Sequence, residues 1–117
     1  MAQVIYVSGP YSANPNDCTL DALHAGEDVV ALGGVPLVPH LSHLWQGVLP
    51  HPWEYWLRID LALVGRCDAV YRLPGASRGA ELEVAEARRL GLPVLTSRDE
   101  LAAFLDAHTT QARSKGP

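Results

Sequence analysis

An acidic side chain interrupts an apolar helical face in the middle of the sequence. Residues 53–64 show helical periodicity, and their apolar stripe consists of Trp53, Trp56, Leu57, Leu61 and Val64. Asp60 occupies the one position of this stripe that is not apolar. Because burying an unpaired charge is costly, Asp60 is expected to be paired, protonated or functional. A structural aspartate, hydrogen-bonded to a neighbouring loop, is an equally good interpretation of this position.

A second acid points inward from a helix expected over residues 79–90. A turn of about 100° per residue gathers its apolar side chains on one side, and these are Ala80, Val84, Ala87 and Leu90. Glu83 falls among them, whereas Glu81 and Glu86 belong to the solvated face. Glu83 also lies near the helix start, where the helix dipole stabilises an ionised carboxylate. We therefore expect an ionised Glu83, and a raised pKa for Asp60.

Two carboxyl groups in different environments are suited to cleaving a glycosidic bond. One carboxylate attacks the anomeric carbon as a nucleophile, and the other group handles a proton or holds a sugar hydroxyl. Both tasks require the two groups to face the same crevice. The elements that carry Asp60 and Glu83 must therefore meet at a ligand-binding edge.

The expected elements alternate between strands and helices. Short apolar runs predict strands at residues 4–7, 35–38, 69–73 and 93–95. Helices are predicted from Asn14–Asp17 to Gly33, over 53–64, over 79–90, and from Ser97 or Arg98 to about His108. This order indicates an α/β fold with a doubly wound, Rossmann- or flavodoxin-like parallel sheet of four to five strands and flanking helices. We expect one domain over residues 1–108 and a flexible tail over 109–117.

Ligands of such sheets lie beyond the carboxyl ends of the strands, at the point where the strand order reverses. The segments expected there are residues 8–12, 40–51 and 74–79. The first contains neither the dinucleotide-binding nor the P-loop pattern. The third leads into a helix N-terminus, where Ser77, Arg78 and backbone N–H groups could hold an anion. Taken alone, that turn is better explained by simple capping from Ser77 or Gly79.

Residues 39–52 contain three prolines and three histidines, and a long ordered loop is expected there. The spacing of His40, His43 and His51 matches no standard zinc pattern, and no cysteine or glutamate completes one, so no metal site is expected. Instead, the loop is expected to cover a ligand with Leu44, Trp45 and Trp53. Aromatic rings there could stack on a nucleobase, although core packing explains them equally well.

The composition excludes several classes of protein. Of 117 residues, 48% are hydrophobic and 19% are charged, which excludes a disordered chain. A formal net charge of −4 argues against duplex nucleic acid as a partner. Cys18 and Cys67 fit neither a disulfide framework nor a thiolate zinc site. No apolar run reaches membrane-spanning length and no signal-peptide pattern is present, so a cytoplasmic protein without a membrane partner is expected.

The sequence resembles the nucleoside 2-deoxyribosyltransferase-like superfamily, which includes deoxyribosyltransferases and deoxynucleoside 5′-monophosphate N-glycosidases. The resemblance covers about residues 4–95 and is carried by short motifs. They are Ile5–Ser12 (IYVSGPYS), Asp60-Leu61, Cys67-Asp68-Ala69-Val70, Ser77-x-Gly79-x-x-x-Glu83-x-x-x-Ala87 and Gly91-x-Pro93-Val94.

This resemblance implies roles for individual residues. Glu83 matches the nucleophile that forms a glycosyl-enzyme, Asp60 the acid that assists the leaving base, and Tyr6 the tyrosine against the sugar and the catalytic glutamate. It implies a small nucleoside or nucleotide substrate, a homo-oligomer, and no cofactor or metal. The expected substrate-binding residues are Ser8, Gly9, Pro10, Tyr11, His40, Trp45, Ser77, Arg78 and Gly79.

Two departures from the family pattern bear on the substrate. Ser77 stands where the transferases usually carry an acid and the monophosphate hydrolases carry a phosphate-binding serine, which favours the hydrolases. Ser12 stands where those hydrolases have an arginine, so Arg72 or Arg78 would have to supply the positive charge. The leading expectation is an N-glycosidase of (deoxy)nucleoside 5′-monophosphates. A nucleoside 2-deoxyribosyltransferase and a non-catalytic nucleotide-binding or sensing protein are the alternatives.

Overall fold

A four-stranded parallel sheet forms the centre of the molecule, which a computed structural model describes over residues 2–115. Its strands are β1 (Val4–Ser8), β2 (Val35–Leu37), β3 (Ala69–Arg72) and β4 (Val94–Leu95). They lie in the order β2-β1-β3-β4, and every neighbouring pair is parallel. The predicted doubly wound α/β sheet is confirmed. The strand order reverses between β1 and β3, so a ligand site is expected where these two strands end.

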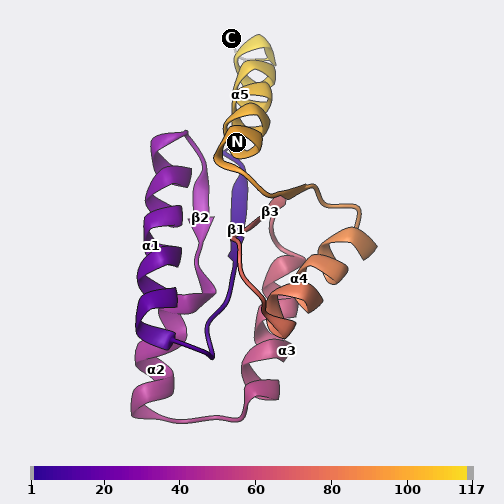
Figure 1. Ribbon diagram of the computed structural model, residues 1–117. Helices are drawn as coiled ribbons and strands as arrows, with labels where there is room; N and C mark the ends of the chain where they lie inside the picture. The colour runs from indigo at the N-terminus through magenta and orange to yellow at the C-terminus, as the bar shows by residue number, and fades with distance from the viewer. Residues whose placement is uncertain (1, 116–117) are drawn as a thin grey trace.

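Five α-helices and one 3₁₀ helix surround the sheet in the described part of the chain. They are α1 (Pro15–Ala31), the 3₁₀ helix η1 (Pro39–Leu41), α2 (Ser42–Val48), α3 (Trp53–Val64), α4 (Arg78–Arg89) and α5 (Arg98–Lys115). In Figure 1, α1 lies on one side of the strands, and α3 and α4 lie on the other. None of these helices is both long and apolar enough to span a membrane.

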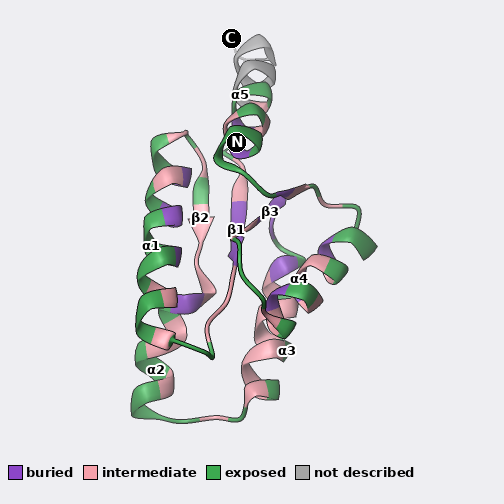
Figure 2. Ribbon diagram, in the orientation of Figure 1, coloured by how far each residue is buried: buried purple, intermediate pink, exposed green. Residues whose placement is uncertain are grey.

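Alternating side chains of β1 build a separate core on each face of the sheet. Ile5 and Val7 belong to the core that includes residues of α1 and α5. Tyr6 belongs to the opposite core, with Val64 of α3 and Ala87 of α4. Figure 2 shows buried residues on β1 and β3 and on the faces of α1 and α4 turned toward the sheet. This period of two sends Tyr6 and Ser8 toward α3 and α4.

The prediction of a long loop over residues 39–52 is wrong, because η1 and α2 occupy most of this segment. Pro39 is at the start of η1, where its fixed φ angle suits the first helical turn. Pro50 and Pro52 follow the end of α2. The prolines therefore flank the helical residues rather than interrupt them.

The last helix begins at Arg98 as expected, but it continues to Lys115 instead of ending near His108. The tail expected over residues 109–117 thus begins within α5. Residues 116–117 of that tail lie outside the described part of the chain.

Candidate active site

Glu83 of α4 lies against β1 and is almost fully buried, with 6% of its surface exposed. The Tyr6 hydroxyl donates a hydrogen bond to Oε2 of Glu83 at 2.6 Å. The Ser8 hydroxyl donates to Oε1 at 2.7 Å. Because residues two apart in a strand share a face, both donors reach the carboxylate from the same side of β1. Each oxygen of Glu83 is therefore held by its own hydroxyl.

The start of α4 determines where Glu83 points. Ser77 is the N-cap, and its Oγ accepts a hydrogen bond from the N–H of Ala80 at 3.1 Å, as the capping interpretation predicts. Counting from that cap, Glu83 lies in the second turn and is one of the buried residues of the helix, together with Ala80 and Ala87. The predicted inward orientation of Glu83 is confirmed.

The electrostatic surroundings of Glu83 differ from the expectation. Burial raises the pKa of this carboxyl, while hydrogen bonds from Tyr6 and Ser8 and the charge of Arg72 oppose that rise. The helix dipole was expected to stabilise the ionised form, but its influence fades beyond the first turn. The two hydroxyls and the arginine, rather than the helix start, favour the anion.

Asp60 of α3 lines the same cavity as Glu83. Burial raises the pKa of Asp60 to about 7, and the negative charge of Glu83 contributes to the rise. This is the direction predicted from its place in the apolar stripe. Asp60 therefore keeps a substantial protonated fraction at neutral pH, because its pKa is raised to about 7, whereas the two hydroxyls and Arg72 favour the ionised form of Glu83.

A cavity of about 450 Å³ opens above these two acids, a size that suits a small molecule. Its walls come from residues 9–13 after β1, from η1 and α2, from α3 and from the start of α4. These segments meet at the carboxyl ends of β1 and β3, where the sheet topology places a ligand.

Most of the expected substrate-binding residues line this cavity, namely Gly9, Pro10, Tyr11, His40, Ser77, Arg78 and Gly79. Tyr6 and Ser8 are fully buried and contact Glu83 instead. Trp45 also lies outside the cavity lining. It is half-exposed and packs edge-on against Trp56, with ring centroids 5.1 Å apart.

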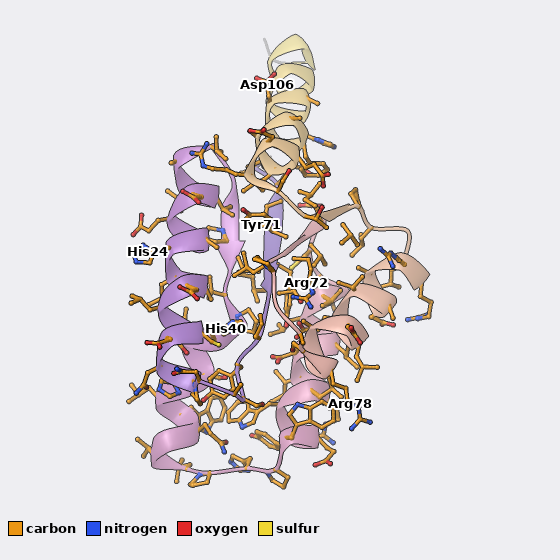
Figure 3. The ribbon with its side chains drawn as sticks, in the orientation of Figure 1. His24, His40, Tyr71, Arg72, Arg78 and Asp106 are labelled. Atoms are coloured by element: carbon orange, nitrogen blue, oxygen red, sulfur yellow. The ribbon has the colours of Figure 1, made fainter. Side chains whose placement is uncertain are left out.

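Only one of the two candidate arginines is at the cavity. Arg72 donates hydrogen bonds to the carbonyl oxygens of Leu73 and Gly75, and so braces the turn between β3 and α4. Arg78 lines the cavity, with its guanidinium 4.8 Å from the centroid of the Trp53 ring. In Figure 3, Arg78 lies near the start of α3, whereas Arg72 lies closer to the strand ends.

The three histidines of residues 39–52 have separate partners. His40 is buried and bonds through Nε2 to the carbonyl oxygen of Pro10 at 2.9 Å. His43 lies between the Tyr11 hydroxyl and Oδ1 of Asn16, at 2.7 Å and 2.8 Å. His51 stacks on the Tyr55 ring. Within residues 2–115, no group of three or more His, Cys, Asp or Glu side chains is arranged to hold a metal ion.

Sequence reasoning did not assign Gln46, His51 and Trp56 to the site, yet all three line the cavity. Oε1 of Gln46 accepts hydrogen bonds from the Trp56 indole and, at 2.9 Å, from the backbone N–H of His51. The apolar stripe predicts Trp56 only as a core residue. No sequence pattern contains Gln46, because its contact with Trp56 of α3 is a tertiary one.

Comparisons with known proteins agree with this fold. A family model described as a domain of unknown function, DUF4406, matches residues 3–96. No curated protein matches the chain. A 2-deoxyribosyltransferase from Bacillus psychrosaccharolyticus has a TM-score of 0.57 and 19% identity, over 78% of this chain and 69% of that one. A 2-desoxiribosyltransferase from Leishmania mexicana has a TM-score of 0.61 and 20% identity, over 80% of this chain and 63% of that one. The fold implied by the sequence resemblance is confirmed.

Proposed function

This chain belongs to the DUF4406 family, and we propose that it cleaves the N-glycosidic bond of a (deoxy)nucleoside 5′-monophosphate through a glycosyl-enzyme on Glu83. One observation carries the proposal. A buried glutamate, held by a hydroxyl on each oxygen, shares a cavity with an aspartate whose pKa is raised to about 7. A nucleophile and a proton donor must coexist at neutral pH for this chemistry.

The reaction uses the two acids in turn. A Glu83 oxygen bonds to C1′ of the sugar as the C1′–N bond breaks, and protonated Asp60 gives its proton to the leaving base. Water then attacks C1′, Asp60 takes up a proton from that water, and Glu83 leaves as the carboxylate. The Tyr6 hydroxyl holds Glu83 throughout, because burial and the nearby acids raise its pKa and keep it protonated.

The start of α4 supports a 5′-phosphate on the substrate. The backbone N–H groups of Arg78 and Gly79 begin the helix and have no acceptor one turn earlier within it. Ser77 and Arg78 both line the cavity, and the Arg78 guanidinium lies 4.8 Å from the centroid of the Trp53 ring. A helix N-terminus with an adjacent arginine is a favourable site for an anion.

A deoxyribosyltransferase is the second candidate, and the fold likeness to two such enzymes favours it. It would use the same nucleophile, with a second base taking the place of water. A protein that binds nucleotides without turnover is the third, since the fold alone does not require catalysis.

One chromatographic screen separates these functions. The protein is incubated with nucleosides and their 5′-monophosphates, with and without a second free base. Released base and free sugar phosphate support the proposal. A new nucleoside that forms only with the second base assigns the transferase. Nucleotide that binds tightly and stays intact assigns the binding protein.

We also propose that this chain forms a homo-oligomer through residues 41–49. This segment exposes five large apolar side chains, namely Leu41, Leu44, Trp45, Val48 and Leu49. Residues 39–53 contain no Asp, Glu, Lys or Arg, so two copies can meet there without charge repulsion although each chain carries a net charge of −4.

Light scattering during size-exclusion chromatography tests this interface. We expect the native protein to elute as an oligomer and Val48→Lys as a monomer, because a lysine in an apolar contact must be desolvated. Val30→Lys, on the exposed face of α1, is the matched control and should keep the native mass. A native protein that is monomeric at micromolar concentration contradicts the proposal.

A further inference from the structure

Ser8 is the last residue of β1 and is fully buried, with 0% of its surface exposed. Its Oγ donates to Oε1 of Glu83 at 2.7 Å, and it is not among the residues that line the cavity. We propose that Ser8 is a positioning residue for Glu83. Its hydroxyl presents the carboxylate to the substrate as an oriented anion and does not itself touch the substrate. This role rests on the proposed function.

The backbone around Ser8 fixes the position of its hydroxyl. Ser8 is in register with Arg72 of β3, and its carbonyl oxygen accepts a hydrogen bond from the N–H of Leu73 at 2.7 Å. The next residue, Gly9, packs closely on the same neighbour, since a Cβ there would lie 3.1 Å from the Leu73 Cβ. Strand alternation then directs the Ser8 side chain toward α4, as it directs Tyr6.

Two hydroxyls constrain Glu83 more than one can. A carboxylate held at a single oxygen still rotates about its last torsion, which is broad for glutamate. Tyr6 holds Oε2 and Ser8 holds Oε1, so the plane of the carboxylate is fixed. Without the Ser8 hydroxyl, the buried Oε1 would lose this hydrogen bond. The stabilisation lost is larger for an ionised carboxylate than for a neutral group.

The protonation state of Glu83 depends on the Ser8 hydroxyl together with the other groups that face this carboxyl. Tyr6 of β1 donates as a neutral phenol, and Asp60 of α3 is the nearby acid. Arg72 of β3 is the positive charge that favours the anion. Burial opposes this effect, because it raises the pKa of Glu83. Removing the Ser8 hydroxyl therefore shifts Glu83 toward its neutral form, which cannot act as a nucleophile.

The test removes the hydroxyl and follows both catalysis and the charge of Glu83. For Ser8→Ala we expect kcat to fall about 10- to 100-fold near neutral pH. We expect KM to stay within about 3-fold of the native value. The acidic limb of kcat/KM should move up by about one pH unit. Ser8→Cys keeps the size and a weaker donor, so its values should lie between those of Ser8→Ala and the native protein.

Thr19→Val is the matched control, because it also removes a hydroxyl. Oγ1 of Thr19 is buried without a hydrogen-bond partner among the described residues. The kcat, the KM and the pH profile of Thr19→Val should equal those of the native protein. A Ser8→Ala protein with raised KM but unchanged kcat and pH profile would show that Ser8 contacts the substrate, and would overturn the proposal.

A second readout does not depend on turnover. The Glu83 carboxyl carbon is titrated by NMR in ¹³C-glutamate-labelled native protein and Ser8→Ala, with Glu83→Gln identifying the signal. A midpoint raised in Ser8→Ala supports the role of Ser8, and an unchanged midpoint overturns it. If the native protein releases no base from any substrate, the proposed function fails, while this titration still decides whether Ser8 controls the charge of Glu83.

Discussion

Two carboxyl groups in one cavity differ in how they are held. Glu83 accepts hydrogen bonds from Tyr6 and Ser8, which favour its anion. For Asp60, burial is the main influence, and it favours the neutral acid. In the proposed reaction, two side chains of the same chemistry therefore serve as nucleophile and proton donor, because their local surroundings favour different protonation states.

The pH dependence of turnover follows from Asp60. In the proposed reaction the protonated form of Asp60 assists the leaving base, so kcat/KM should fall as the pH rises past about 7. Asp60→Asn keeps the size of the side chain but cannot transfer a proton. We expect it to lower kcat by about 100-fold or more and to remove the alkaline limb. A variant with native activity and an unchanged profile would make Asp60 a structural residue.

Stability measurements provide an independent check on the same carboxyl. The folded-state pKa of Asp60 lies above its usual value, so the native state binds the extra proton. The resulting stabilisation is complete below about pH 4 and is lost as the pH rises through about 7. The free energy of unfolding is measured in urea at pH 5 and at pH 8. Between these two pH values it should fall less in Asp60→Asn than in the native protein. An equal loss in both would show that Asp60 does not titrate as described.

At the scale of elements, α4 combines a structural cap with a proposed anion site. Ser77 caps the helix through Oγ, and its position at the cavity allows the O–H to donate to a phosphate. Ser77→Ala should lower the free energy of unfolding by about 1 kcal/mol. It should also reduce kcat/KM about 10-fold for the 5′-monophosphate, with little change for the nucleoside.

Ser77→Asp separates these two roles, because aspartate caps a helix well but repels phosphate. It should therefore retain stability in urea unfolding while losing the preference for the monophosphate. Equal kcat/KM of the native protein for a deoxynucleoside and its 5′-monophosphate would refute the phosphate site and favour the transferase.

The turn between β3 and α4 depends on Gly75. Its φ of +115° is one that side chains rarely adopt, and a Cβ there would lie 2.7 Å from Cγ of Pro10. Gly75→Ala should therefore destabilise the protein by about 1–3 kcal/mol in urea unfolding. Gly91→Ala, where φ is also positive at +76° but nothing lies within 4 Å of the added Cβ, is the control and should cost less, about 1 kcal/mol. Equal effects would contradict the packing described for the turn.

Periodicity in the sequence predicted the elements that carry the acids but not every wall of the cavity. The helices that carry Asp60 and Glu83 were predictable because their apolar residues recur at helical spacing. The two acids stood out because each occupies a position on that apolar face. The helix α2 was not predictable, since its flanking prolines resemble those of a loop. Trp45 was expected at the ligand, but it packs against Trp56 because it belongs to α2. No local sequence pattern predicts this contact.

At the scale of the whole molecule, sheet topology gathers the site. The strand order places the ends of β1 and β3 side by side and brings Ser8 into register with Arg72. Alternation of strands and helices was enough to predict this edge as the ligand site. The sequence could not show that Arg72 braces a turn while Arg78 reaches the cavity, because that depends on side-chain directions set by tertiary packing.

The central claim is that Glu83 is the nucleophile of glycosidic cleavage, and base release by three glutamine variants of α4 tests it most directly. Glu83→Gln should lose at least about 1000-fold in kcat, because an amide cannot form the glycosyl-enzyme. Glu81→Gln and Glu86→Gln, whose side chains lie outside the cavity lining, should stay within about 3-fold of native. Thermal melts check that all three variants fold. A folded Glu83→Gln that releases base at the native rate, or an equal loss in Glu81→Gln, would contradict this account.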